Sequence, residues 1–175
     1  MYLCCRCIHY NEIVSMCICH LLLVWTISVL AVFVVYMKIG LQIKANLEKL
    51  TNLHPSGEDF RWYVRLRCAN CGEETKEFQY LTLTESSPLK GGRGQASLVI
   101  KCHLCSRENS IDIIKDSAVS YNAEDSNKFK TVVVFDCRGV EPIDFSPRVG
   151  FAAEGEETGT PFPEISLTEG VGTVT

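Results

Sequence analysis

Two short stretches, YVRLRCANCGEE (residues 63–74) and SLVIKCHLCSRE (residues 97–108), determine the fold that we expect. Each begins with an apolar-rich segment that ends on a basic residue, continues through Cys-x-x-Cys and leaves through polar residues. The offset between the two cysteine pairs is constant, because Cys102 and Cys105 lie 34 positions after Cys68 and Cys71. This repetition predicts a duplicated unit of strand, tight cysteine-bearing turn (a knuckle) and strand.

The spacing within each pair suits a metal ion. Two residues between the cysteines allow one tight turn to aim both sulfur atoms at a single point, and two such turns supply four thiolates at the corners of a tetrahedron. Zn(II) prefers this geometry, with Zn–S distances of about 2.3 Å. We therefore expect one structural Zn(II) per chain, because four sulfur ligands leave no open position for a substrate; the expected ligands are Cys68, Cys71, Cys102 and Cys105.

Two other interpretations of the cysteine pairs remain open. Each pair could form a disulfide or a redox dithiol, although neither lies in the βα pattern of a thioredoxin-like site. The four residues could also be reduced core cysteines, but two matched pairs seldom arise by chance. Three basic residues beside the pairs favour the metal site, because they would offset the negative charge of four thiolates; they are Arg67, Lys101 and Arg107.

The sequence on both sides of the knuckles alternates between apolar and polar residues, as in half-buried β-strands. Turn-forming residues separate these segments, at 52–58, 86–94, 122–127 and 139–147. No stretch after Met37 shows helical periodicity over three turns. We expect a mostly β fold, an antiparallel sandwich or barrel built around the two knuckle hairpins, with strands at 39–47, 62–67, 78–83, 96–101, 110–114 and 131–135.

The first 36 residues differ in composition from the remainder of the chain. They carry two formally charged side chains, Arg6 and Glu12, whereas the later residues carry all the others. Residues 17–36 are almost entirely apolar, and a helix of 20 residues spans roughly 30 Å, the thickness of a bilayer core. This predicts one apolar N-terminal helix, a candidate transmembrane segment, before the β domain.

Three domains follow from these differences. Residues 1–36 form an N-terminal extension, residues 37–153 a zinc-binding β domain, and residues 154–175 a loosely ordered tail rich in Gly, Glu, Thr and Pro. If the extension is real, the protein is a single-pass membrane protein, with membrane contact only through residues 17–36. The alternative is that the extension is a gene-model artefact and that Met37 is the true start. In either case we expect the zinc domain to lie in the cytoplasm.

Composition excludes some functions. The 175 residues contain 17 Lys and Arg against 21 Asp and Glu, a net charge of -4, which argues against a nucleic-acid partner. No catalytic constellation is evident, so we expect no catalytic residues and no enzyme. His103 is expected to be an exposed residue of the second knuckle, and Cys137 a small buried hydrophobe. The segment KGGRG (residues 90–94) lacks the Lys-Ser/Thr and helix of a phosphate-binding loop.

The chain resembles the eukaryotic CXXC-motif-containing zinc-binding proteins. The resemblance implies a small, all-β intracellular protein that binds one zinc through the four cysteines, and no enzymatic activity is established for that family. Family members begin near Met37 and extend beyond residues 165–167, which implies a missing terminal strand here. The matching stretches are GEDFRW (57–62), Cys68-x-Asn70-Cys71-Gly72, LKGGRG (89–94), KCxLCxRENS (101–110), YNAED (121–125) and FAAEG (151–155).

The function expected from these observations is that of a zinc-stabilised module that binds a protein partner of unknown identity. Its candidate contact surface consists of the polar loops 86–94 and 121–127 and the two knuckle tips, where Leu104 is the most specific candidate. The alternatives are a metal-handling protein of the metallochaperone type and, less favoured, a CxxC thiol redox protein.

Overall fold

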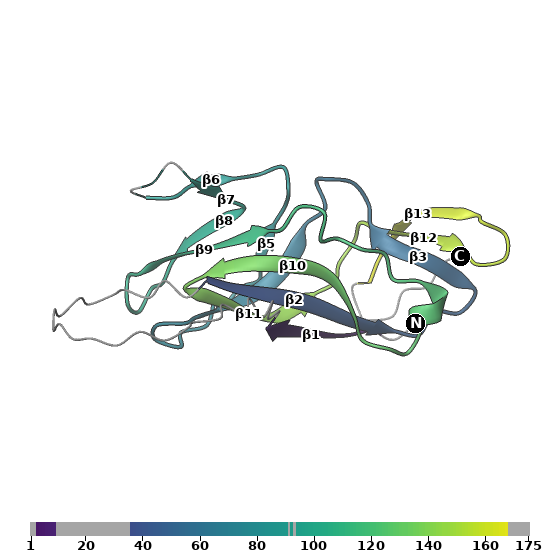
Figure 1. Cartoon of the computed structure of the whole chain (residues 1–175), viewed down its shortest axis with the longest axis horizontal. Coiled ribbons are helices and arrows are strands. Elements are labelled where there is room, and N and C mark those ends of the chain that lie inside the picture. The colour runs from purple at the N-terminus through teal and green to yellow at the C-terminus, as the bar shows by residue number, and fades with distance from the viewer. Residues whose placement is uncertain (1–2, 10–35, 91, 93, 168–175) are drawn as a thin grey trace, which may run out of the picture.

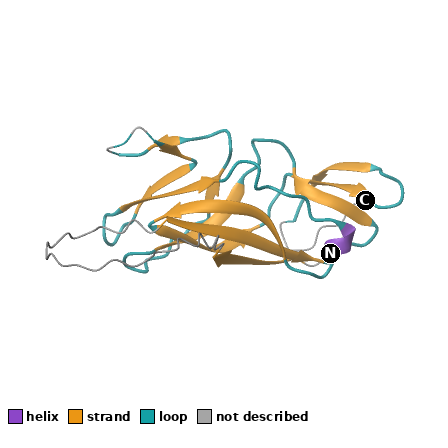
Figure 2. Ribbon diagram, in the orientation of Figure 1, coloured by secondary structure: helices purple, strands orange, loops and turns teal. Residues whose placement is uncertain are grey.

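The structure is a computed structural model, and it describes residues 3–9, 36–90, 92 and 94–167. Within these residues strands dominate, with a single 3-10 turn, η1 (Ala123–Asp125) (Figure 2). The strands are β1 (Leu3–His9), β2 (Tyr36–Ala45), β3 (Leu50–Pro55), β4 (Trp62–Cys68), β5 (Gln79–Leu81), β6 (Ser87–Pro88), β7 (Gln95–Ala96), β8 (Leu98–Lys101), β9 (Glu108–Ile113), β10 (Lys130–Arg138), β11 (Val140–Ser146), β12 (Phe151–Gly155) and β13 (Pro161–Ile165).

The strands form antiparallel sheets, so the prediction of a mostly β, antiparallel fold is confirmed. A five-stranded sheet has the order β1-β2-β10-β9-β8, and two three-stranded sheets have the orders β11-β4-β5 and β13-β12-β3. The short pair β6-β7 completes the set. In Figure 1, β6 to β9 lie toward one end of the elongated molecule, and β3, β12 and β13 lie at the other.

The core lies between the β4 sheet and the five-stranded sheet. Trp62 on β4 packs edge-on against Phe135 on β10, with ring centroids 6.4 Å apart, and also contacts Phe145 on β11 at 5.9 Å. The alternation predicted from the sequence places one face of each strand in this core, as in a sandwich. The buried alternating residues are Ile39, Leu41 and Ile43 on β2, and Trp62, Val64 and Leu66 on β4.

Two strands lie where the sequence predicted turns, so those loop predictions were wrong. β3 occupies most of the predicted loop 52–58, and its Leu53 is buried and forms a bridge with Tyr121. β11 occupies the predicted turn 139–147 and pairs with β4 along most of its length. A register shift after Pro142 accommodates the missing N–H group of proline within this strand. Pairing with partners distant in sequence outweighed the local turn signals in both segments.

The apolar helix predicted at residues 17–36 lies outside the described residues except for Tyr36, which begins β2. Within the part of the chain that the structure describes, no helix is long and apolar enough to cross a membrane. Residues 3–9 of the predicted extension are instead strand β1, paired with β2 from Leu3↔Ala45 to His9↔Ile39. Its Arg6 donates a hydrogen bond to Gln42 at 2.7 Å. Strands from both sides of the compositional boundary near residue 36 therefore belong to the same sheet.

The predicted loose tail also differs from the structure. Residues 154–165 form the end of β12, a turn and β13, and both Ile165 and Leu167 are buried in the core. The apolar residues Phe162, Ile165 and Leu167 give this segment a buried face despite its many Gly, Thr and Glu residues. Residues 168–175 lie outside the described part.

Candidate metal centre

The first knuckle follows directly from β4. Its strand ends at Cys68, whose N–H donates to the carbonyl of Glu73 at 2.8 Å. The N–H of Gly72 donates to the carbonyl of Cys68, also at 2.8 Å, which closes the turn. Gly72 has φ +78°, a left-handed conformation that favours glycine. The chain then returns beside β4 through a bridge between Arg67 and Glu74.

The second knuckle repeats this backbone pattern between β8 and β9. The N–H of Cys102 donates to the carbonyl of Arg107 at 2.9 Å, and that of Ser106 donates to the carbonyl of Cys102 at 3.0 Å. Ser106, which corresponds to Gly72, is also left-handed, with φ +59°. Each hydrogen bond lies 34 positions after its counterpart in the first knuckle. The two knuckles therefore share one backbone design, in agreement with the predicted duplication.

The structure brings the four predicted ligand residues together. Their sulfur atoms all lie within 4.8 Å of one another. The Sγ atoms of Cys71 and Cys102 are 3.4 Å apart, and those of Cys68 and Cys105 are 3.8 Å apart. Four Zn–S bonds of about 2.3 Å in a tetrahedron place the sulfurs about 3.8 Å apart, so the cluster fits a zinc ion.

The two sides of the cluster differ in access to solvent. Cys68 and Cys102 begin their knuckles at the ends of strands and are buried, whereas Cys71 and Cys105 are half-buried. Beyond them the knuckle tips are exposed, as expected for His103. Leu104 is the most exposed of the large apolar side chains in the described residues, at 70%. The cluster is therefore enclosed by the sheets on one side and reaches the surface on the other.

The groups around the two buried thiols shift their pKa values in opposite directions. Burial raises the pKa of Cys68, but hydrogen bonds from the N–H groups of Cys71 and Asn70 and from the Asn109 amide outweigh it and lower that pKa to about 6. The N–H of Cys105 lowers the pKa of Cys102, yet the contact with Glu73 and burial outweigh it and raise that pKa to about 12. Of these two buried thiols, Cys68 therefore has the lower pKa.

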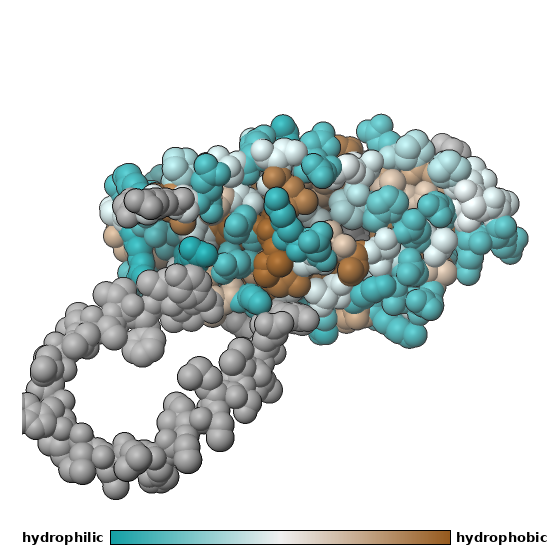
Figure 3. All heavy atoms as spheres, turned by 45° about the horizontal axis from the view of Figure 1, so that its top comes forward, coloured by the Kyte–Doolittle hydropathy of each residue, from teal (hydrophilic) through white to brown (hydrophobic). Residues whose placement is uncertain are grey.

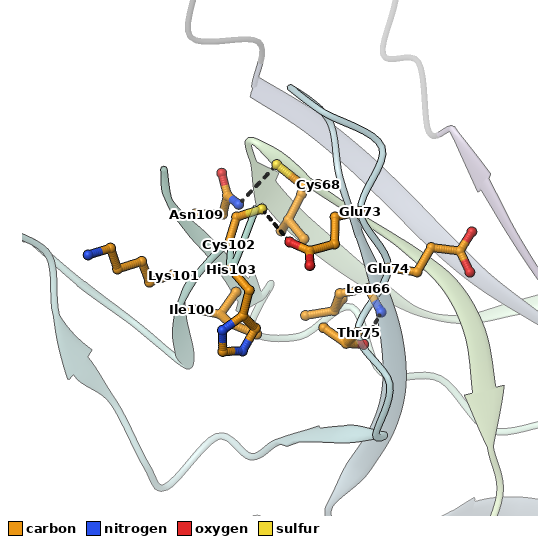
Figure 4. Close-up of a pocket in the computed structure, with 11 residues that line it drawn as sticks. Leu66, Cys68, Glu73, Glu74, Thr75, Ile100, Lys101, Cys102, His103 and Asn109 are labelled. Carbon is orange, nitrogen blue, oxygen red and sulfur yellow. Dashed lines mark hydrogen bonds between the residues drawn. The ribbon is translucent and has the colours of Figure 1, made fainter. Parts of the chain in front are cut away.

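Glu73 links the two knuckles, a role that the sequence did not suggest. Its carboxylate accepts a hydrogen bond from the thiol of Cys102 at 2.9 Å and one from the N–H of Leu104 at 2.7 Å. These two donors, the Cys102 thiol first, lower the pKa of Glu73. Figure 4 shows the carboxylate beside Cys102, at the edge of a small hollow of about 30 Å³. The two turns are thus joined by a side chain as well as by their shared sulfur cluster.

Asn109 on β9 is a second residue whose role the sequence did not suggest. Its buried side chain donates a hydrogen bond from Nδ2 to the sulfur of Cys68 at 3.6 Å (Figure 4). The other amide atom, Oδ1, has no hydrogen-bond partner and faces Gly139, where an added Cβ would lie only 2.5 Å away. Gly139 has φ +73°. A glycine between β10 and β11 therefore makes room for the amide that contacts the metal cluster.

The predicted basic residues are arranged less simply than their spacing suggested. Arg67 donates to Glu74 at 2.9 Å, so its charge is already paired within the first knuckle. Arg107 reaches across to the other knuckle, with Nη1 3.5 Å from Oδ1 of Asn70. Cys137 lies on β10 outside the sulfur cluster; it is buried, and burial raises the pKa of its thiol.

Comparison with known proteins places these features in a family. The sequence model for the family described as CXXC motif containing zinc binding protein, eukaryotic, matches residues 40–171. A protein of that name from Xenopus laevis is 65% identical over 133 residues, which cover 76% of this chain and 83% of the relative. The human protein of that name is 59% identical over 132 residues, which cover 75% of this chain and 82% of the relative.

Solved structures agree with this relationship. The crystal structure of C1orf123 has 59% sequence identity and a TM-score of 0.72, and the match covers 75% of this chain and 83% of that one. A hypothetical protein from Plasmodium falciparum shares the fold at 24% identity, with a TM-score of 0.65 and coverage of 73% and 81%. The chain therefore belongs to the eukaryotic family of CXXC motif containing zinc binding proteins.

Proposed function

We propose that the chain holds one zinc ion, bound by Cys68, Cys71, Cys102 and Cys105, and that the zinc-stabilised β domain binds a protein partner without catalysing a reaction. The position of the two knuckles in different sheets supports a structural role for the metal. The first knuckle belongs to the β11-β4-β5 sheet and the second to the five-stranded sheet, so one ion ties the ends of two sheets together. Such an ion replaces packing that a narrow sheet end lacks.

The filled coordination sphere favours binding over chemistry. Four sulfur atoms complete the tetrahedral shell of zinc, whereas catalytic zinc sites keep one position for water or substrate. Zinc would supply structural cross-linking here, and the Asn109 amide would orient Cys68, as outer residues of metal sites do. Glu73 would hold the second knuckle through the N–H of Leu104. We therefore propose a binding role without enzymatic activity.

The knuckle tips support a protein-binding role better than the 121–127 loop does. Leu104 exposes 70% of its surface beside the exposed His103, and both lie in a turn held by a rigid sheet, where binding residues are often found. The 121–127 loop is instead tied to the core, because the buried Tyr121 hydroxyl lies within hydrogen-bonding distance of the carbonyls of Asp125 and Lys128, the latter at 2.9 Å. We therefore assign the contact surface to the knuckle tips.

The proposal is tested on the full-length chain. Metal analysis after purification without chelator should give about one zinc per chain, and chelation should lower the metal content and the melting temperature together. A folded, metal-free protein would refute the structural role. Partner capture by cross-linking should be lost in Leu104→Asp and retained in Val149→Asp, a matched change at another exposed apolar residue. Turnover of a substrate that depends on Cys137 would refute the non-enzymatic role.

Metal transfer to a client is the second candidate. It is favoured by the half-buried state of Cys71 and Cys105, which leaves one side of the cluster within reach of an incoming ligand. A transfer role predicts that zinc passes to a soluble chelator within minutes, whereas a structural ion should remain bound for hours. A thiol redox role is less favoured, because the four sulfurs form one shared cluster rather than two separate pairs.

The proposed zinc site also indicates the cellular compartment in which the zinc domain resides. The proposed zinc site needs four reduced cysteines, Cys68, Cys71, Cys102 and Cys105, and cysteines stay reduced in a reducing compartment. We place the zinc domain in the cytoplasm on this ground. Fractionation of cells that express the tagged full-length chain tests this assignment, which recovery of the protein in secreted or lumenal fractions would contradict.

A further inference from the structure

Two neighbouring hollows lie on the surface away from the cysteine cluster. One has a volume of about 350 Å³ and the other about 470 Å³. They share three lining residues, Leu83, Ile113 and Ile114, so the two hollows adjoin each other, and we refer to them together as the groove. Volumes of roughly 300–1,000 Å³ are typical of sites that bind ligands. Figure 3 shows that one face of the molecule carries a central group of apolar side chains bordered by hydrophilic ones.

The first hollow has a mostly apolar lining, which also includes the carboxylates of Glu58 and Asp116. Phe60 and Trp62 line it, and their rings meet edge-on with centroids 4.8 Å apart. Phe60 also packs edge-on against Phe151 at 4.8 Å, so the aromatic lining is held by the core. Two further lining residues, Leu83 and Val119, remain exposed by 40% and 43%. Burying these side chains against another apolar group would remove apolar surface from water, which is favourable.

The second hollow is acidic. Asp112 on β9 and Asp136 on β10 lie directly opposite each other in the antiparallel ladder, an arrangement that is destabilising for like charges. Glu85 adds a third carboxylate to the lining, and Lys115 is the only basic residue among those that line it. Arg138 pairs with Asp136 at 3.3 Å from within the strand, but it does not line the hollow.

Neighbouring groups hold the acidic hollow in shape. Asp112 accepts hydrogen bonds from the N–H and the hydroxyl of Ser97 at 3.2 and 2.6 Å. The N–H of Ile113, beyond the last β8–β9 pair at Leu98↔Ile111, donates to Asp112 at 3.1 Å. This backbone group is already paired with a side chain, so an added β-strand would not find it free. Recognition in this groove therefore depends on side chains that enter the two hollows.

We propose that the groove binds an extended peptide segment of a partner protein, with an apolar side chain in the Phe60–Trp62 hollow and a Lys or Arg side chain in the acidic hollow. The negative charge of the second hollow favours binding of a cationic side chain, and the aromatic residues of the first favour an apolar side chain. Successive side chains of an extended segment point to opposite faces, so the two side chains that enter the groove should lie two or four positions apart. This inference rests on the proposed protein-binding role and adds a contact site separate from the knuckle tips.

The test is a selection of phage-displayed random dodecapeptides on the immobilised, zinc-loaded full-length chain. The enriched peptides should share an apolar residue two or four positions from a Lys or Arg. The most enriched sequence, synthesised with a fluorescent label, is then titrated by anisotropy. Because electrostatic attraction is screened by salt, its binding should weaken as the salt concentration rises.

Groove variants identify the binding site. Leu83→Asp and Glu85→Lys change exposed side chains and should leave the zinc content and melting temperature unchanged. Leu83→Asp should weaken peptide binding about tenfold or more, and Glu85→Lys about fivefold, in line with the loss of a central anchor and of a charge contact. Val149→Asp and Glu157→Lys are matched exposed controls outside the lining and should bind as the parent does.

Three results would overturn the inference: no enrichment of basic–apolar sequences, enrichment of acidic ones, or equal binding by the groove variants and the parent. Leu104→Asp separates this inference from the proposed contact at the knuckle tips. Loss of peptide binding in Leu104→Asp with retention in Leu83→Asp would move the site to the knuckles. Retained peptide binding in Leu104→Asp, with its partner capture unchanged, would refute the knuckle surface and leave the groove in place.

Discussion

Replacement of Gly139 by alanine should weaken zinc binding indirectly, through the side chain of Asn109. The added Cβ would lie 2.5 Å from Oδ1 of Asn109, which is too close for any real contact, so the Asn109 side chain must move. The same amide donates to the sulfur of Cys68 at 3.6 Å. The substitution should therefore break a hydrogen bond to a predicted zinc ligand, although residue 139 does not itself touch the four sulfurs.

Two effects lower the free energy of unfolding of the Gly139→Ala variant. A non-glycine residue at φ +73° costs about 1–2 kcal/mol in backbone energy. Loss of a hydrogen bond to a charged sulfur adds about 1.5–3 kcal/mol. The free energy of unfolding of the zinc-loaded chain should thus fall by about 2.5–5 kcal/mol. Zinc affinity should fall roughly 10- to 100-fold, as is typical when an outer partner of a ligand is removed.

Gly159→Ala supplies the matched control, because Gly159 has φ +64° and nothing lies within 4 Å of its added Cβ. Urea unfolding of the zinc-loaded proteins and competition with a chromogenic chelator measure both effects. Gly159→Ala should show the backbone cost alone, with zinc affinity unchanged. In an Asn109→Ala background, Gly139→Ala should likewise cost only the backbone term. Equal losses for the two glycine variants, or unchanged zinc affinity in Gly139→Ala, would refute the reasoning.

Three further predictions concern the cluster and the core. Cys71→Ser should lower the zinc content and melting temperature together, and a normal melting temperature without zinc would contradict this link. Glu73→Gln should move the midpoint of zinc uptake to lower pH, because Glu73 raises the pKa of Cys102 and thiols must lose their protons to bind zinc, whereas Glu74→Gln should leave it unchanged. Tyr121→Phe should lower the free energy of unfolding by about 1–3 kcal/mol in urea, because buried backbone groups lose their hydroxyl partner, and an unchanged value would contradict this role.

The sequence alone was sufficient for the features that depend on local spacing. A cysteine pair separated by two residues determines its own turn, so the two knuckles and their 34-residue repeat could be predicted without knowledge of the partner strands. The alternating residues of β2 and β4 predicted half-buried strands, because the side-chain period of two is a property of the strand itself. These features led to the four cysteines and to an antiparallel β fold.

Other features depend on residues that only the folded chain brings together. β3 and β11 carry turn-forming residues, and pairing with β12 and β4 makes them strands. The contact between Glu73 and Cys102 spans 29 residues, and that between Asn109 and Cys68 spans 41. The paired carboxylates of Asp112 and Asp136 likewise face each other only through the register of β9 and β10.

The physical reason for this division is the range of the forces involved. Turn geometry and strand alternation follow from the backbone and side-chain directions of a few consecutive residues, so they can be read from the sequence. Hydrogen bonds, charge pairs and steric limits act over a few ångströms in space, irrespective of sequence distance. The sulfur cluster could therefore be predicted from two local turns, whereas its supporting residues, the space at Gly139 and the groove depend on how the sheets pack.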